Sequence, residues 1–211
     1  MLAIHRISAS YNHKPIIEEI SLNLAEGNVL ALIGPNGSGK TTFIRAVSGV
    51  LPLRSGCVKV NGTDIKHMSA QQRARMIAVV PQSRSFPPAF TTQEVVALGR
   101  TPYLNWLGKI TEKDQAVIDR ALEKMDLLEL RHRSVGELSG GEQQRLYLAR
   151  SLAQESAFLL MDEPATHLDL QYQVNLMQRI YQLVHPSEED RKAGMMPRTV
   201  RRSVPDKNGA S

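Results

Sequence analysis

The residues best suited to chemistry lie at positions 34–41, which read Gly-Pro-Asn-Gly-Ser-Gly-Lys-Thr. Glycines at this spacing let successive backbone N–H groups turn toward phosphate oxygens, and a following helix adds the partial positive charge of its N-terminus. Lys40 is placed to reach the β- and γ-phosphates of a nucleotide, and the hydroxyl of Thr41 to bind Mg²⁺. The alternative is a glycine-rich turn with a chance Lys-Thr pair. The apolar run before the motif and the helical pattern after it favour a phosphate-binding P-loop.

Two adjacent carboxylates, Asp162 and Glu163, follow an apolar run at residues 157–161. Burying them without partners would be costly, so we expect them to face a metal ion or a polar cleft. In a P-loop protein the first carboxylate can hold Mg²⁺ directly or through water, and the second can orient or deprotonate the attacking water. The pair is therefore a candidate for the catalytic side of a nucleotide site.

A third feature is the Leu-Ser-Gly-Gly-Glu stretch at residues 138–142. Ser139 and Glu142 have the spacing of a capping box, which predicts a helix running to about Gln154. The two glycines leave the first N–H groups of that helix uncovered, so this helix start is also a candidate anion site. A plain helix start is the alternative, and the two interpretations are compatible.

These candidate residues need strands and helices to position them. Short apolar runs at residues 29–33, 76–80 and 157–161 predict buried parallel strands, and the first leads directly into the P-loop. Alternation between residues 20 and 24 predicts a half-buried strand in a β-rich N-terminal region. Helical patterns with caps or stop signals occupy further stretches, namely residues 41–47, 91–99, 111–125 and 170–184.

The composition is that of one globular unit. The 211 residues suffice for one sizeable core, and the hydrophobic share of 42% and charged share of 22% are ordinary. No apolar run approaches the ~20 residues of a membrane span, and the first residues lack the apolar core of a secretory signal. Cys57 is the only cysteine, which excludes disulfides within the chain and thiolate metal clusters. The net charge of +5 does not by itself indicate nucleic-acid binding, because the basic residues are scattered.

Taken in order, these motifs resemble the ATP-binding subunit of an ABC transporter over residues 1–185. Five segments carry the resemblance: residues 34–41 match the Walker A motif, Gln82 the Q-loop, residues 138–143 the signature motif, residues 158–163 the Walker B motif and residues 167–169 the D-loop. Tyr11 falls where the family stacks an aromatic ring on adenine. From its spacing alone, Tyr11 would be an ordinary half-exposed tyrosine.

The resemblance implies an α/β fold: a P-loop NTPase core with an N-terminal antiparallel β subdomain and a helical subdomain inserted at about residues 91–154. It implies ATP and Mg²⁺ as cofactors and an ATPase activity coupled to transmembrane transport. The implied catalytic residues are Glu163, Gln82 and Lys40, and the implied magnesium residues are Thr41, Gln82 and Asp162. The implied nucleotide-binding residues are Tyr11, Gly34, Asn36, Gly37, Ser38, Gly39, Lys40, Thr41, Thr42, Ser139, Gly140 and Gly141.

The resemblance also implies partners. Two copies would pack head to tail, so that Ser139, Gly140 and Gly141 of one copy close the ATP of the other, with Asp169 supporting the contact. The helical subdomain would receive a transmembrane permease at the cytoplasmic face of the cell membrane. A substrate-binding protein would be an indirect partner, and no nucleic acid is expected. Residues 96–103 and 168–170 resemble the prokaryotic importer branch for ferric siderophores, haem or cobalamin.

The chain departs from the family after residue 185. The family has one more core strand there, between the P-loop strand and the Walker B strand, ending in a histidine that contacts the γ-phosphate. Residues 186–211 contain no apolar run, and neither His167 nor His185 is a credible counterpart of that histidine. We expect residues 186–211 to be a disordered basic tail. We further expect a shortened or frame-altered version of a longer protein that folds poorly alone and hydrolyses ATP slowly, if at all.

Three functions compete. The first is the energy-coupling ATPase of a metal-chelate importer. The second is a soluble ABC-type ATPase acting on ribosomes or DNA, although the single cassette and the lack of a long coiled coil argue against the best-known forms of it. The third is a non-catalytic remnant that binds nucleotide without turnover.

Overall fold

The computed structural model describes residues 1–11, 14–82, 86–164 and 170–185. Over these residues, the mixed α/β fold contains two separate sheets, one antiparallel with four strands and one parallel with two strands. In the part of the chain that the structure describes, no helix is both long and apolar enough to cross a lipid bilayer.

The antiparallel sheet carries the N-terminal region and has the strand order β2-β1-β3-β4. Its strands are β1 (Leu2–Tyr11), β2 (Lys14–Leu24), β3 (Ser55–Val60) and β4 (Thr63–Asp64). The helix that follows the P-loop, α1 (Lys40–Val47), packs on β1 and β2. Phe43 and Val47 of α1 share one apolar core with the inward residues of the strands. The predicted β-rich N-terminal region is therefore confirmed.

The parallel sheet consists of β5 (Ile77–Val80), which follows α2 (Ala70–Met76), and β6 (Phe158–Met161). The strands pair residue by residue from Ile77 with Phe158 to Val80 with Met161. This confirms two of the three predicted parallel strands. Because both strands run in the same direction, the residues that follow them meet at one edge of the sheet.

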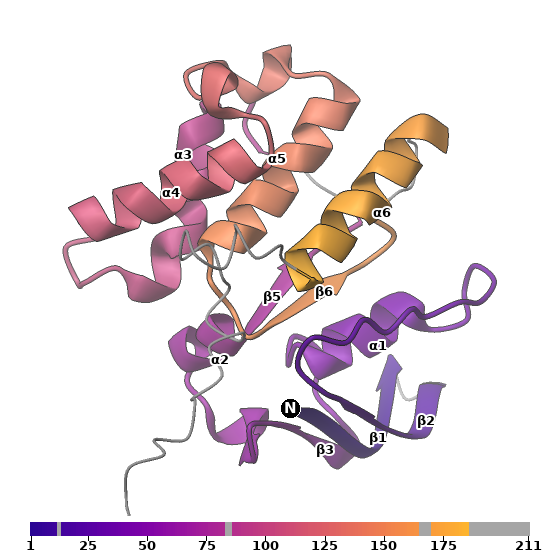
Figure 1. Cartoon of the computed structure of the whole chain (residues 1–211). Coiled ribbons are helices and arrows are strands. Elements are labelled where there is room, and N and C mark those ends of the chain that lie inside the picture. Colours follow the sequence, from indigo (N-terminus) through magenta and orange to yellow (C-terminus); the bar gives the residue numbers. More distant parts are fainter. Residues whose placement is uncertain (12–13, 83–85, 165–169, 186–211) are drawn as a thin grey trace, which may run out of the picture.

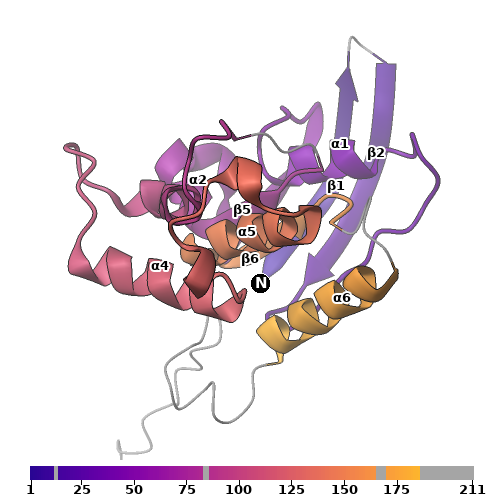
Figure 2. The same ribbon diagram turned by 90° about the horizontal axis from the view of Figure 1, so that it is seen from above.

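A second core joins three helices, α3 (Thr92–Ala97), α4 (Glu112–Lys124) and α5 (Gly140–Ala153). Each begins at a hydroxyl cap in a reciprocal capping box: Thr91 for α3, Thr111 for α4 and Ser139 for α5. Figure 1 shows these helices on one side of the parallel pair and α1 with the antiparallel sheet on the other. Figure 2 shows β1 and β2 at the opposite side of the molecule from α4.

Short 3-10 helices connect these elements, at Ile65–His67, Leu98–Tyr103, Leu128–Leu130 and Val135–Glu137. The second of them corrects the prediction that Gly99 ends a helix. The chain continues helically through Gly99, which instead lies against α5, so that an added Cβ would come within 2.2 Å of the Arg150 carbonyl oxygen. Close packing of two helices therefore requires glycine at this position.

The last described helix is α6 (Leu170–Val184), as the sequence predicted. Its buried residues include Leu176 and Ile180, and Arg179 donates hydrogen bonds to the Lys124 carbonyl and to Asp126 at the end of α4. An apolar stripe on α6 remains exposed and consists of Leu170, Val174, Met177 and Tyr181.

The expectation of a buried strand at residues 29–33 is wrong for this structure. These residues are in no strand, and the side chains of Leu30 and Ile33 are 47% and 96% exposed. A strand forms only where its backbone groups pair with a neighbour. Within the described ranges, nothing occupies the space between residues 29–33 and β6 that could supply such pairing.

Candidate nucleotide-binding site

The P-loop connects residues 29–33 to α1 through a compact glycine-rich turn. Gly37 and Gly39 have φ values of 82° and 95°, in the left-handed region that favours glycine. The Ser38 amide donates to the Pro35 carbonyl at 3.2 Å, and α1 starts at Lys40 with Gly39 as its N-cap. The predicted arrangement of a glycine-rich loop leading into a helix N-terminus is therefore present, and Asn36 and Ser38 in the loop are exposed.

Lys40 folds back over this loop. Its Nζ donates hydrogen bonds to the Gly34 carbonyl at 2.8 Å and to the Pro35 carbonyl at 3.0 Å. The ammonium group is therefore held beside the loop, where its charge can attract phosphate oxygens. The neighbouring Thr42 differs from the other predicted nucleotide-binding residues, because its side chain is buried in α1.

Two predicted magnesium residues meet at the start of α1. The Thr41 hydroxyl donates to Asp162 Oδ1 at 3.1 Å, across 121 positions of sequence. Asp162 is buried, and its amide donates to the Val80 carbonyl, so β6 and β5 fix its position. A hydroxyl and a carboxylate are oxygen donors of the kind that Mg²⁺ prefers. The donor set fits this ion, which proteins usually hold through one or two carboxylates together with substrate phosphates.

The two remaining catalytic candidates lie at the same sheet edge. Gln82 follows β5, Glu163 follows β6, and the Gln82 side-chain amide donates to Glu163 Oε2. Glu163 has a φ of 46°, an uncommon value for a non-glycine residue and one that is often associated with function. The structure therefore joins Gln82 to Glu163 and Thr41 to Asp162. The sequence predicted these residues as members of one site, Gln82 through the family resemblance alone, but it did not predict these pairs.

Tyr11 lies at the end of β1, where its hydroxyl accepts a hydrogen bond from Arg45 Nη1 of α1 at 3.2 Å. This bond raises the pKa of the Arg45 guanidinium above its ordinary value. The contact ties the tyrosine to the helix that begins at the P-loop. Arg45 is a residue that the sequence analysis missed, and its position five residues after Lys40 was the only available signal.

The signature segment forms a separate part of the candidate site. Ser139 caps α5 and pairs reciprocally with Glu142, and the Gln143 side chain donates to the Leu138 carbonyl at 3.1 Å. The hydrogen bond from the Ser139 amide lowers the pKa of the Glu142 carboxyl. Ser139 and Gly140 are exposed, and a Cβ on Gly140 would meet no atom within 4 Å. The start of α5 is therefore open to a partner or ligand.

A second residue that the sequence analysis missed connects this helix to the carboxylates. The side-chain amide of Gln144 on α5 donates to the carbonyl of Pro164, one residue after Glu163. The helix of the signature segment therefore contacts the chain directly after the Walker B carboxylates. His167 and Asp169, which the D-loop match named, lie outside the described residues.

Comparisons with known proteins agree with this geometry. The family model described as "ABC transporter" matches residues 17–166. In Bacillus subtilis, the "Probable siderophore transport system ATP-binding protein YusV" is 34% identical over 92% of this chain and 70% of its own length. The iron(3+)-hydroxamate import ATP-binding protein FhuC of the same organism is 35% identical over 86% of this chain and 68% of its own. The cobalamin import ATP-binding protein BtuD of Halobacterium salinarum is 38% identical over 83% of this chain and 43% of its own length.

Solved structures show the same fold. The dimeric ATP-binding cassette MJ0796, bound to ADP and Pi, aligns with a TM-score of 0.73 at 26% identity, over 90% of this chain and 84% of that one. The ATP-binding cassette MJ1267 in its ADP conformation aligns with a TM-score of 0.78 at 24% identity, over 88% of this chain and 77% of that one. The P-loop NTPase fold class expected from the sequence is confirmed. Since the family model covers well over half of the sequence, the chain belongs to the ABC transporter family.

Proposed function

We propose that this chain binds ATP with Mg²⁺ and acts as the energy-coupling subunit of a prokaryotic ABC importer. The observation that carries the proposal is the hydrogen bond from Thr41 to Asp162. It places the first hydroxyl of the P-loop helix against a buried carboxylate, beside an ammonium group held over the loop. That combination of donors suits a magnesium-bound triphosphate.

Each residue has a role in this proposal. The amides of the P-loop and Lys40 bind the phosphates, and Lys40 exchanges its carbonyl partners Gly34 and Pro35 for phosphate oxygens. Thr41, Asp162 and Gln82 would hold Mg²⁺, which neutralises charge on the β- and γ-phosphate oxygens when bound. Glu163 orients or deprotonates the attacking water. Tyr11 stacks on adenine.

The assembly that we propose has two copies of the nucleotide-binding chain arranged head to tail. Ser139, Gly140 and Gly141 of one copy then contact the nucleotide of the other, which suits the open start of α5. Residues 91–154 form the helical subdomain that meets a transmembrane permease at the cytoplasmic face of the membrane, and a substrate-binding protein delivers the cargo. The names of YusV, FhuC and BtuD support a siderophore, hydroxamate or cobalamin cargo.

Nucleotide binding is tested by calorimetric titration of the purified chain with ATP and Mg²⁺. We expect Lys40→Ala to weaken binding at least about tenfold, because it removes a charge-assisted contact. Lys66→Ala, which removes an exposed lysine after β4, is the matched control and leaves binding unchanged. A folded wild-type chain that binds no nucleotide, or equal binding by both variants, would contradict the proposal.

A second candidate function is nucleotide binding without turnover. The exposure of residues 29–33 favours it, because the segment that leads into the P-loop has no sheet to hold it. Phosphate release by the wild type beside Glu163→Gln distinguishes the two. Turnover that this substitution abolishes, with ATP binding retained, supports the ATPase. ATP binding without turnover in either protein supports the second candidate.

The cargo requires a transport measurement. The chain is co-expressed with a permease, and the complex is reconstituted in vesicles that are loaded with a ferric siderophore or with cobalamin. The rate of ATP hydrolysis then reports which cargo stimulates the complex. Stimulation by neither one would argue against a metal-chelate importer, even where ATP binding is intact.

A further inference from the structure

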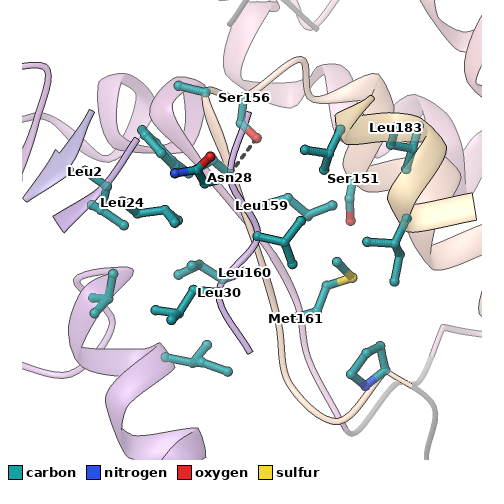
Figure 3. Close-up of a pocket in the computed structure, with 18 of the residues that line it drawn as sticks. Leu2, Leu24, Asn28, Leu30, Ser151, Ser156, Leu159, Leu160, Met161 and Leu183 are labelled. Atoms are coloured by element: carbon teal, nitrogen blue, oxygen red, sulfur yellow. Dashed lines mark hydrogen bonds between the residues drawn. The ribbon is translucent and has the colours of Figure 1, made fainter. Parts of the chain in front are cut away.

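The two ends of the β1–β2 pair have different surroundings. Leu2 and Leu24, which pair at one end, line an apolar groove between residues 29–32 and β6. Figure 3 shows these two leucines at one side of that groove. Tyr11 pairs with Lys14 at the other end of the two strands, where Tyr11 is 40% exposed. A ligand can therefore reach the ring of Tyr11 without entering the apolar groove.

The Tyr11 end of the pair lies beside the P-loop. Gly39, the N-cap of α1, packs so closely on β2 that an added Cβ would come within 3.2 Å of Ile17 and 3.3 Å of Ile16. Lys14, the partner of Tyr11, precedes Ile16 by only two positions on the same strand. The pairing of the strands therefore brings the tyrosine next to the loop that we propose to bind phosphates.

Arg45 ties this tyrosine to the helix that starts at the loop. Its Nη1 donates to the Tyr11 hydroxyl at 3.2 Å, across 34 positions of sequence. Arg45 follows Thr41 by four positions, so the two residues are neighbours on one face of α1. The bond to Tyr11 raises the pKa of the Arg45 guanidinium most, and the negative charge of Asp162 raises it further. The guanidinium is therefore within electrostatic reach of both Tyr11 and the Thr41–Asp162 pair.

We propose that Arg45 is a positioning residue for the nucleotide base: it holds the Tyr11 ring in the orientation that stacks on the base, and so makes the site prefer nucleoside triphosphates to bare polyphosphates. The inference rests on the proposed function, because it concerns the base of the same bound ATP. Ordering an exposed side chain when a ligand binds costs conformational entropy. A charge-assisted bond that already fixes the hydroxyl lowers that cost.

The side chain of Arg45 is not what holds the end of α1 together. Its backbone carbonyl accepts hydrogen bonds from the Ser48 hydroxyl and from the amides of Val50 and Leu51. Alanine keeps this carbonyl and is the best helix former. Arg45 is also exposed, so its replacement leaves no cavity in the core. Arg45→Ala therefore removes the contact with Tyr11 and leaves the helix in place.

The test compares ATP with inorganic tripolyphosphate, each with Mg²⁺, in calorimetric titrations of the full chain. Tripolyphosphate has no base, so the ratio of the two dissociation constants reports the preference for a ligand with a base. Loss of a positive charge near the site weakens both ligands and by itself does not lower this preference. We expect Arg45→Ala to lower the preference for ATP at least about threefold, the effect of one hydrogen bond.

Further variants separate positioning from other roles. Tyr11→Phe keeps the ring and every charge but removes the hydroxyl that Arg45 binds, so it should lower the preference by a similar factor. Adding Arg45→Ala to Tyr11→Phe should cause no further change, because both substitutions remove the same bond. Arg45→Lys keeps a cationic donor and should restore part of the preference. Arg54→Ala, which removes an exposed arginine directly before β3, is the matched control and should leave the preference unchanged.

Two results would overturn this inference alone. One is an unchanged preference for ATP in Arg45→Ala, whether both ligands bind as before or both lose affinity equally. The other is a further loss when Arg45→Ala is added to Tyr11→Phe, which would show that Arg45 does not act through the hydroxyl. Circular dichroism checks the fold of each variant, and if Arg45→Ala is unfolded, Tyr11→Phe decides the question. A folded wild-type chain that binds neither ligand would contradict the proposed function, and the inference with it.

Discussion

The helices α3, α4 and α5 and the segment before the P-loop both carry apolar side chains, yet only the helices bury them. Val95 and Leu146 in the helices are 0% exposed, whereas Leu30 and Ile33 are 47% and 96% exposed. An α-helix pairs its backbone groups within itself and needs only one packed face. A parallel strand needs a neighbour on each side to be buried. A local sequence pattern is therefore enough to form these helices but not to form the strand.

The largest loss of stability is expected at a buried ion cluster in the helical part, around Arg100. Arg100 donates to Asp114 Oδ1 at 2.9 Å, to Glu155 Oε2 at 2.9 Å and to the Ala153 carbonyl at 2.8 Å. Arg100→Ala should lower the free energy of unfolding by about 3–5 kcal/mol, because it removes the cation that pairs with the buried Asp114 carboxylate and with the half-buried Glu155 carboxylate. Urea unfolding followed by circular dichroism measures this.

The matched control for that prediction is Arg6→Ala, which breaks an ion pair with Glu19 whose side chains are 72% and 65% exposed. An exposed pair of this kind contributes only about 0–1 kcal/mol. Similar losses for the two variants would show that the Arg100 cluster is not the anchor of the helical part.

The next largest difference in stability is expected between two leucines, one from each region, when each is replaced by alanine. Leu146→Ala creates a cavity in the core around α5 and should lower the free energy of unfolding by about 2–5 kcal/mol. Leu30→Ala removes a half-exposed side chain from a segment without a sheet and should change it by less than about 0.5 kcal/mol. The same urea titration measures both. A large loss at Leu30 would mean that residues 29–33 are packed in solution.

A smaller effect is expected at the cap of α5. Ser139→Ala should lower the free energy of unfolding by about 1 kcal/mol, because the helix loses its N-cap acceptor for the Glu142 amide. Ser139→Gly should cost only a few tenths of a kcal/mol, since glycine is a tolerated cap residue. Equal losses for the two variants would indicate that the hydroxyl is not the source of the effect.

The smallest effect is a pH dependence at the same helix start. The pKa of Glu142 is lowered from its ordinary value of 4.5, first by the hydrogen bond from the Ser139 amide and then by the Ser139 hydroxyl. Its contribution to stability is therefore present above pH 4.5 and is lost as the pH falls through the lower folded value. Between pH 6 and about 3, Glu142→Gln should lose less stability than the wild type. Identical pH profiles in urea titrations would contradict this role for the carboxylate.

Much of the fold could be predicted because its signals are local. Thr91, Thr111 and Ser139 each cap a helix at the position that the spacing indicates. Gly37 and Gly39 of the P-loop adopt the left-handed conformation that glycine readily reaches. The role of Gly99 could not be predicted in this way. Its reason is a contact with α5, about fifty positions further along the chain.

In the candidate site, too, the sequence predicted which residues take part but not which of them are in contact. Residue types and spacing predicted Lys40, Thr41, Asp162 and Glu163 as one group, and the resemblance to the family added Gln82. The pairs that they form could not be predicted, because the register of β5 on β6 decides that Gln82 contacts Glu163. The same applies to the bond from Arg45 to Tyr11 and to that from Gln144 to Pro164, whose partners lie 34 and 20 positions away.

The helices, their caps, the phosphate-binding loop and the family could all be predicted from the sequence, because each depends on residues within a few positions of one another. Whether residues 29–33 become a strand depends on the tertiary structure, since backbone pairing in a sheet comes from distant parts of a chain or from another chain. In this structure no described strand provides it, so the run remains exposed beside β6 and the two segments form an apolar groove.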